Sequence, residues 1–242
     1  MTCGETKARG GTEHDKAENG EQGFRGDRPG QWARRGPRGG GEMRTASIII
    51  NAIIFVSTLI TLLSYFRKDG AWDIDQGLKQ FRFFTVLSNT FCAVAALMMA
   101  VSQLGGDVPQ PVLQIKYMAT VSVTVTLLTV LLFLAPTQGG YIKWLSGDFF
   151  YMHLLGPVLA IASFCLLEKR EMTLAAAMTG IIPMLLYGAV YLYKVMLAPE
   201  ERRWKDFYGF NRNEKWPFAC IAMLVGASAI CVLFWVVCGP HH

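Results

Sequence analysis

Three polar residues, Thr85, Ser88 and Asn89, have types and spacing that could do chemistry. They lie near the start of a long apolar run, and with Cys92 they fall at i, i+3, i+4 and i+7, which places them on one face of a helix. Lipid offers such groups no hydrogen-bonding partner, so this face must meet protein or water. A threonine hydroxyl becomes a nucleophile only beside a base, so Thr85 would need one from elsewhere in the chain.

His153 is the candidate base, because it lies inside an apolar segment. The other histidines lie in the N-terminal region (His14) and at the C-terminal end (His241 and His242). An ionisable residue within a membrane span is costly and is by default a functional candidate. The alternative is a neutral imidazole hydrogen-bonded to a neighbouring helix. Pro157 has no N–H to donate to the carbonyl of His153, and the resulting break in the helix favours a site.

The elements that must position these residues are membrane helices. The chain has 242 residues, of which 52% are hydrophobic and 17% charged, and the apolar residues occur in blocks. Six blocks approach the roughly 20 residues that cross a bilayer as a helix. They span residues 45–66, 83–104, 113–134, 149–167, 173–197 and 217–237. The sequence therefore predicts an all-α membrane protein, a six-transmembrane-helix bundle over residues 45–238.

Residues 1–44 are rich in glycine and in charges of both signs, with few apolar side chains, and we expect a disordered tail. Met43, followed by Arg44 and an apolar run, would be an ordinary start for a bacterial inner-membrane protein, and one hypothesis is that translation begins at Met43. Arginines before the first span favour a cytoplasmic N-terminus. Basic residues after the first span and in the loop 198–216 would lie on the opposite side of the membrane, and their number nearly equals that of the arginines before the first span.

The net charge of +5 is interpreted as charge that sets the orientation of the protein in the membrane, and no nucleic-acid partner is expected.

Other spans contain polar stripes at helical spacing. In the fifth span, Tyr187 and Tyr191 follow Pro183 at i+4 and i+8 and are expected to face the interior, with Lys194 at i+11. The remaining stripes are interpreted as hydrogen-bonding contacts between helices. They comprise Lys116, Thr120 and Thr124 in the third span, and Ser47, Asn51 and Thr58 in the first.

Several kinds of chemistry are disfavoured. The chain has no HExxH, GxSxG, Walker or GxGxxG motif, and its six cysteines form no CxxC pair, so no metal and no cofactor is expected. No Asp or Glu lies within the interior of a predicted span, and residues 168–171 are interpreted as a turn. The lack of an intramembrane carboxylate counts against a proton-coupled transporter.

Three short motifs resemble those of a known family. The segment 83–89, the histidine–proline pair at His153 and Pro157, and the aromatic elements 208–210 and 216–218 resemble signatures of Pr6Pr-type bacterial six-helix membrane proteins. That family is related to the androgen-induced, FAR-like multi-pass hydrolases, which use an intramembrane threonine and histidine to cleave fatty acid esters of hydroxy fatty acids. The resemblance covers roughly residues 45–237.

The resemblance implies a lipid ester hydrolase in which Thr85 is the nucleophile and His153 its base. Ser88, Asn89, Tyr187 and Tyr191 are then expected to line the substrate site, with Asn89 or Tyr187 donating to the oxyanion. The histidine–proline spacing is one residue shorter here than in the animal enzymes. The acidic residue that follows in several relatives is replaced by apolar and small residues at 160–164.

Three alternatives remain open. A membrane acyltransferase would resolve the same acyl-enzyme with an alcohol instead of water. A channel or transporter for a small solute would need a continuous polar pathway, and a structural subunit would need no polar pocket.

Overall fold

The structure is a computed structural model that describes residues 41–168, 171–211 and 216–238. The tail expected over residues 1–44 lies outside this range except for its last four residues, which are already helical. Residues 169 and 170 of the expected turn, and His241 and His242, also lie outside it.

Within the part of the chain that the structure describes, six helical segments are long and apolar enough to span a membrane, as the sequence predicted. They are Gly41–Tyr65, Phe84–Gly105, Gln110–Thr137, Tyr151–Glu168, Leu174–Leu197 and Trp216–Cys238. Their boundaries lie within four residues of the predicted ones. The protein is therefore an all-α, multi-pass integral membrane protein.

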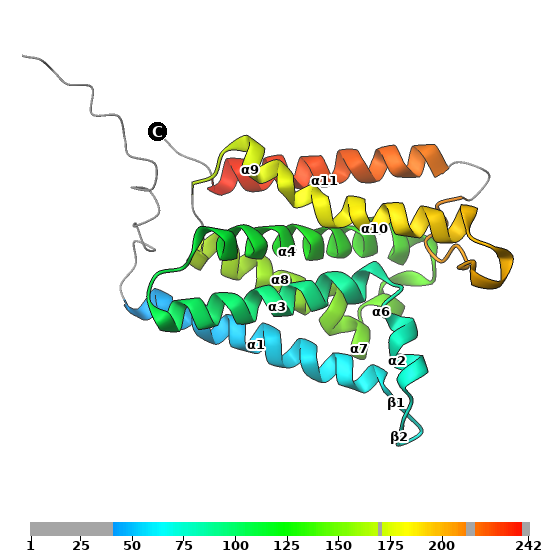
Figure 1. The fold of residues 1–242 in the computed structure, drawn as a ribbon, viewed down its shortest axis with the longest axis horizontal. Helices are drawn as coiled ribbons and strands as arrows, with labels where there is room; N and C mark the ends of the chain where they lie inside the picture. Colours follow the sequence, from blue (N-terminus) through cyan, green and yellow to red (C-terminus); the bar gives the residue numbers. More distant parts are fainter. Residues whose placement is uncertain (1–40, 169–170, 212–215, 239–242) are drawn as a thin grey trace, which may run out of the picture.

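The first, second and sixth segments are single α-helices, whereas the other three change helical type along their length (Figure 1). The single helices are α1 (Gly41–Tyr65), α3 (Phe84–Gly105) and α11 (Trp216–Cys238). The third segment comprises α4 (Gln110–Thr129), the π-helix η2 (Val130–Leu134) and α5 (Ala135–Thr137). The fourth comprises the π-helix η3 (Tyr151–Leu155), α8 (Gly156–Ala162) and the π-helix η4 (Ser163–Glu168). The fifth comprises α9 (Leu174–Met178), the 3₁₀-helix η5 (Thr179–Ile181), α10 (Ile182–Leu192) and the π-helix η6 (Tyr193–Leu197).

Proline explains the change of helical type near His153. Pro157 occupies the first turn of α8, where it has no N–H to donate. The chain reaches it through η3, in which the amide of Gly156 bonds to the carbonyl of Tyr151 five residues earlier. Short π segments of this kind occur often at functional sites. The break predicted from Pro157 therefore exists, as a wider turn that contains His153.

Helix α4 lies in the middle of the bundle, with α10 and α11 on one side and α1 and α3 on the other (Figure 1). Its residues 119–127 are almost all buried. On the α11 side, the rings of Tyr117, Phe164 and Phe234 pack together with centroids 5.6–6.0 Å apart. On the α1 side, small residues such as Ala95, Ala96 and Ala119 allow close packing.

The outer helices expose large aliphatic side chains, as expected of faces that meet lipid. Ile60 on α1 and Val225 and Leu233 on α11 are each more than half exposed. Polar residues point the other way: Ser47, Asn51 and Thr58 on α1 are buried against the bundle. The polar stripes predicted from helical spacing therefore face protein.

One end of the bundle carries small elements that the sequence analysis did not resolve (Figure 1). A hairpin of β1 (Arg67–Lys68) and β2 (Ala71–Trp72) turns at Asp69 and Gly70, whose φ angles are 51° and 84°. It is followed by α2 (Ile74–Gln80). The same end holds α6 (Gly140–Trp144), α7 (Asp148–Phe150) and the 3₁₀-helix η7 (Glu200–Arg202).

Candidate functional site

Thr85 lines a cavity of about 300 Å³ between α3, α4, α10 and α11, at the end of the bundle that carries the hairpin. Most of the wall is apolar, with side chains such as Val130, Met184 and Leu224. The polar residues of the wall carry hydroxyl groups; they are Thr85, Thr126, Thr129, Tyr187, Tyr191 and Tyr208. A cavity of this kind suits an apolar chain with one small polar group.

Ser88 and Asn89 lie behind Thr85 and not on the cavity wall. The Ser88 hydroxyl donates to the carbonyl of Thr85 and lies 2.9 Å from Thr126 Oγ1 on α4. Asn89 Nδ2 donates to the carbonyl of Thr85 (2.8 Å) and to that of Met152 (2.9 Å). Both side chains are buried. The stripe predicted on α3 therefore holds the first turn of this helix against α4 and η3.

Tyr187 and Tyr191 line the cavity, but their hydroxyls are engaged elsewhere. Tyr187 donates to the carbonyl of Arg82 at 2.8 Å, and Tyr191 donates to Asp206 Oδ1 at 2.7 Å. What these residues present to the cavity is largely aromatic surface. Lys194, the last residue of the predicted stripe, lies in η6, not on the cavity wall.

His153 is buried in η3 and is held by Trp144 and Phe149. Its Nδ1 lies 3.0 Å from the carbonyl oxygen of Trp144. Its ring stacks on the ring of Phe149 and makes an edge contact with the ring of Trp144. A carbonyl only accepts hydrogen bonds, so Nδ1 must carry the proton and Nε2 the lone pair. A backbone carbonyl thus orients the imidazole, which is the role that an acidic residue has in many catalytic pairs.

Thr85 and His153 come from neighbouring elements. Asn89 is one turn from Thr85, and it bonds to the carbonyl of Met152, the residue before His153. Within the described residues no hydrogen bond joins Thr85 to His153, and the imidazole is not on the cavity wall. The catalytic pair therefore stays a prediction.

The segment 203–211 covers the cavity with aromatic rings. The carboxylate of Asp206 accepts bonds from the Tyr191 hydroxyl and from the amides of Phe210 and Asn211. Tyr208 reaches α3, where its hydroxyl accepts the amide N–H of Phe84 at 3.0 Å. In the sequence, Tyr208 is distinguished only as part of the aromatic motif 208–210. The signal in the sequence is Asp206 two residues earlier, since aspartate commonly organises a turn.

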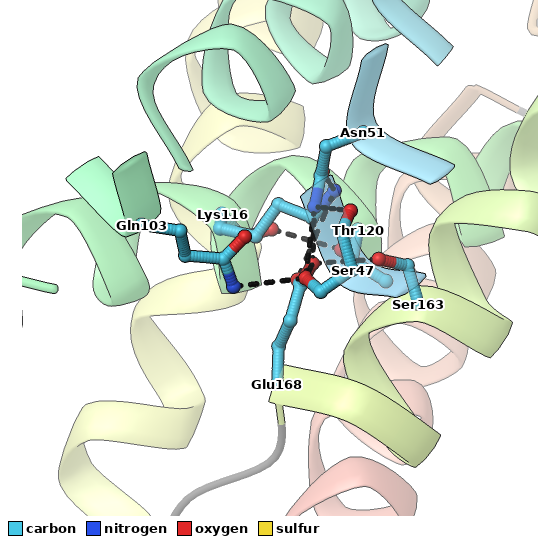
Figure 2. A network of polar contacts seen from close by, with 7 residues as sticks. All are labelled: Ser47, Asn51, Gln103, Lys116, Thr120, Ser163 and Glu168. Atoms are coloured by element: carbon cyan, nitrogen blue, oxygen red, sulfur yellow. Dashed lines mark hydrogen bonds and ion pairs between the residues drawn. The ribbon is translucent and has the colours of Figure 1, made fainter. Parts of the chain in front are cut away.

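A second polar group lies at the opposite end of the bundle, and we call it the Lys116 cluster (Figure 2). Four elements, α1, α3, α4 and η4, contribute its side chains. They are Ser47, Asn51, Gln103, Lys116, Ser163 and Glu168, all at most 3% exposed. Lys116 Nζ donates to Asn51 Oδ1 at 2.6 Å and lies 3.9 Å from Glu168 Oε2.

One oxygen of Glu168 receives most of the donors in the Lys116 cluster. Oε1 accepts from Ser47 Oγ at 2.7 Å, from Ser163 Oγ at 2.6 Å and from Asn51 Nδ2. Gln103 Nε2 donates to Ser47 Oγ at 2.9 Å. Among the described residues, Gln103 Oε1 and Glu168 Oε2 accept no hydrogen bond. The cluster is a helix contact built around a desolvated ion pair.

The position of Glu168 corrects the interpretation of residues 168–171 as a simple turn between helices. Glu168 is the last residue of the fourth segment, and its side chain is fully buried. In the sequence, the apolar run ends at Leu167, and Glu168 was therefore assigned to the turn between the fourth and fifth spans. Lys116 supplied the missing signal, since a lysine inside a span requires a counter-charge. The expectation that Lys116, Ser47 and Asn51 make helix contacts is confirmed.

The contacts between helices expected of Thr120 and Thr124 are not the bonds that their hydroxyls make, because both bond within α4, as threonines in membrane helices usually do. Their hydroxyls bond to the carbonyls of Lys116 and Thr120, one turn earlier.

Comparisons with known proteins gave no match: no family model, no curated protein and no solved structure matches the chain.

Proposed function

We propose that this integral membrane protein hydrolyses a fatty-acyl ester, with Thr85 as the nucleophile and His153 as its base. The observation that carries the proposal is the position of Thr85, which lines a largely apolar cavity inside a membrane bundle. The short motifs that resemble the Pr6Pr-type and androgen-induced families support the same residues.

The cavity has the chemistry that such a substrate requires. An acyl chain entering from the lipid would pack against Val130, Met184 and Leu224, and it would leave no water behind. Its ester group would then meet the hydroxyls near Thr85.

The reaction would proceed through an acyl-threonine. Thr85 Oγ bonds to the ester carbonyl carbon, the carbonyl π pair moves onto oxygen, and the threonine proton passes to Nε2 of His153. When the carbonyl re-forms, the C–O bond to the alcohol breaks and the alkoxide takes the proton from His153. Water, deprotonated by His153, then attacks the acyl-threonine, and Thr85 recovers its proton. The carbonyl of Trp144 keeps Nε2 as the basic nitrogen throughout.

The test is hydrolysis of a labelled long-chain ester, together with covalent labelling by a lipophilic fluorophosphonate, in detergent or nanodiscs. Thr85→Ala should abolish both. Thr90→Ala is a matched control on the same helix, because the Thr90 hydroxyl only bonds back to the carbonyl of Val86 at 2.7 Å. Equal labelling of wild type and Thr85→Ala would refute the proposal. Release of an alcohol ester in place of the free acid would identify the acyltransferase alternative.

The Lys116 cluster favours a second candidate, a transporter of a small solute. An intramembrane carboxylate was the feature whose absence argued against transport, and Glu168 supplies one, paired with Lys116. This candidate predicts substrate-dependent currents from reconstituted protein on a supported membrane, lost in Glu168→Gln. Unchanged currents in that variant would exclude the role of the pair.

We further propose a bacterial inner-membrane location with a cytoplasmic N-terminus. The arginines before α1 support this orientation, whereas the end of the bundle near the cavity is also basic, with Arg67, Arg82 and Arg203. Reporter fusions after residue 72 and after residue 107 lie on opposite sides of α3 and test the orientation directly. A cytoplasmic signal from the first fusion alone would reverse it.

A further inference from the structure

An acyl transfer at Thr85 needs a hydrogen-bond donor for the oxyanion, and the two donors expected from the sequence are occupied. Both hydrogens of Asn89 Nδ2 are used, on the carbonyls of Thr85 and Met152. The single hydroxyl hydrogen of Tyr187 is used on the carbonyl of Arg82. Either group could serve an oxyanion only by giving up a bond that holds α3 or α10 in place.

Tyr208 is differently placed. Its hydroxyl oxygen accepts the amide N–H of Phe84 at 3.0 Å, next to Thr85 in the chain, and its side chain lines the same cavity. Within the described residues, its hydroxyl has no carbonyl or carboxylate acceptor at hydrogen-bonding distance. The side chains of Tyr187 and Thr85 lie next to this hydroxyl, so its proton is held by no stronger acceptor than another hydroxyl and can turn to a ligand oxygen in the cavity.

The hydroxyl of Tyr208 lies beside the proposed nucleophile, because it accepts the amide N–H of Phe84, the residue before Thr85. Burial raises the pKa of Tyr208 above its ordinary value of 10.0. The Phe84 amide, which donates to the phenol oxygen, opposes this rise in the pKa most strongly, ahead of smaller contributions from the neighbouring Tyr187 and Thr85, but burial has the larger effect. The phenol thus stays protonated at neutral pH, as a donor must, and its neighbours place it beside Thr85.

The segment that carries Tyr208 is fixed before any ligand arrives. The amide of Tyr208 donates to the Tyr191 hydroxyl at 3.2 Å, which in turn donates to Asp206. The ring of Tyr208 packs against Phe207 and Tyr191, with centroids 4.8 Å and 5.3 Å away. A donor held in this way stabilises a developing charge without reorganising during the reaction.

We propose that the Tyr208 hydroxyl donates a hydrogen bond to the oxyanion that forms when Thr85 attacks an acyl carbonyl in the cavity. This role rests on the proposed function. Tyr208 keeps its proton throughout: the carbonyl π pair moves onto oxygen, the phenol O–H shares its hydrogen with that oxygen, and the bond weakens again when the carbonyl re-forms. Phe84 N–H polarises the phenol by donating to its oxygen.

The first test is the kinetics of Tyr208→Phe, which removes the hydroxyl and keeps the ring. The proposal expects kcat for ester hydrolysis to fall by about 10²–10³-fold, as for the loss of one oxyanion donor, with KM nearly unchanged. Tyr193→Phe is the matched control with unchanged activity, because Tyr193 is half exposed and does not line the cavity. Tyr187→Phe should have a smaller effect than Tyr208→Phe, and the reverse order would overturn the assignment.

A second measurement separates a catalytic role from a structural one. A long-chain trifluoromethyl ketone forms a hemiketal oxyanion with a nucleophilic hydroxyl, whereas the matching methyl ketone binds without forming one. Tyr208→Phe should weaken binding of the first by about the same factor as kcat and leave the second unchanged. Equal weakening of both would show that Tyr208 only shapes the cavity, and the proposal would fail.

The outcomes also distinguish this inference from the function on which it depends. Wild-type protein without hydrolysis and without Thr85-dependent labelling overturns the proposed function and the role of Tyr208 together. Active wild-type protein whose kcat changes less than threefold in Tyr208→Phe overturns the role of Tyr208 alone.

Discussion

The two ends of the bundle treat buried polar groups in opposite ways. In the Lys116 cluster, charged and polar side chains bond to one another across four elements, and none of them lines the Thr85 cavity. Around Thr85, hydroxyls border a cavity and the groups behind them bond mainly to backbone carbonyls. The contrast teaches that burial of a polar group does not by itself indicate chemistry. A reactive role requires a polar atom that faces space a ligand can fill.

The largest effect should come from His153. Replacing it with Gln removes the base, so hydrolysis should fall by about 10²–10⁴-fold, the range for general-base catalysis. The measurement is kcat with a long-chain ester, and unchanged thermal unfolding shows that the fold survives. If activity persists, His153 belongs with the structural polar groups and the contrast between the two ends breaks down.

Removal of one charge from the Lys116 cluster should destabilise the protein strongly. Lys116→Met leaves Glu168 buried without its counter-charge, which is expected to cost about 3–5 kcal/mol. Glu168→Gln should have a similar cost, whereas the double variant should lose less than the sum of the two, because no charge remains unpaired. Equilibrium unfolding in mixed detergent measures all three.

The ester hydrolysis of the double variant sharpens the same comparison. A purely structural cluster predicts normal kcat for the protein that remains folded. A loss of activity without a loss of folded protein would assign this end a direct function.

The effect of a single donor to Glu168 should be smaller. Ser163→Ala removes one of the bonds to Glu168 Oε1 and should cost about 2 kcal/mol, as for a hydrogen bond to a charged group. Ser228→Ala is the control, because the exposed Ser228 hydroxyl only bonds back to the carbonyl of Leu224. Equal unfolding free energies for the two variants would contradict a carboxylate that depends on Ser163.

The smallest effect should come from narrowing the cavity. Gly188 lines it, and an added Cβ at this position meets no atom within 4 Å, so Gly188→Leu should fold normally. Its side chain would occupy the space for an acyl chain and raise KM for long-chain esters about tenfold. Gly226→Leu on α11 is the matched control, since Gly226 also has open space but does not line the cavity. Equal KM values would place the substrate elsewhere.

The sequence alone determined the membrane architecture, because apolar length is a local property that each segment expresses independently. The six spans and the inward direction of Ser88, Asn89, Ser47 and Asn51 followed from helical spacing and from the lack of hydrogen-bonding partners in lipid. The residue at which a span ends was less well determined by the sequence. Glu168 was assigned to a turn for that reason.

Only the tertiary structure decided what each polar group meets, because a hydrogen bond needs direction as well as a suitable residue type. It joined Lys116 to Glu168, 52 positions apart, and it gave His153 a backbone carbonyl in place of an acidic partner. It also brought Tyr208, from a loop between the last two spans, to the first turn of α3 beside Thr85. Spacing along one helix cannot reveal such contacts, since they depend on how several helices pack around each other.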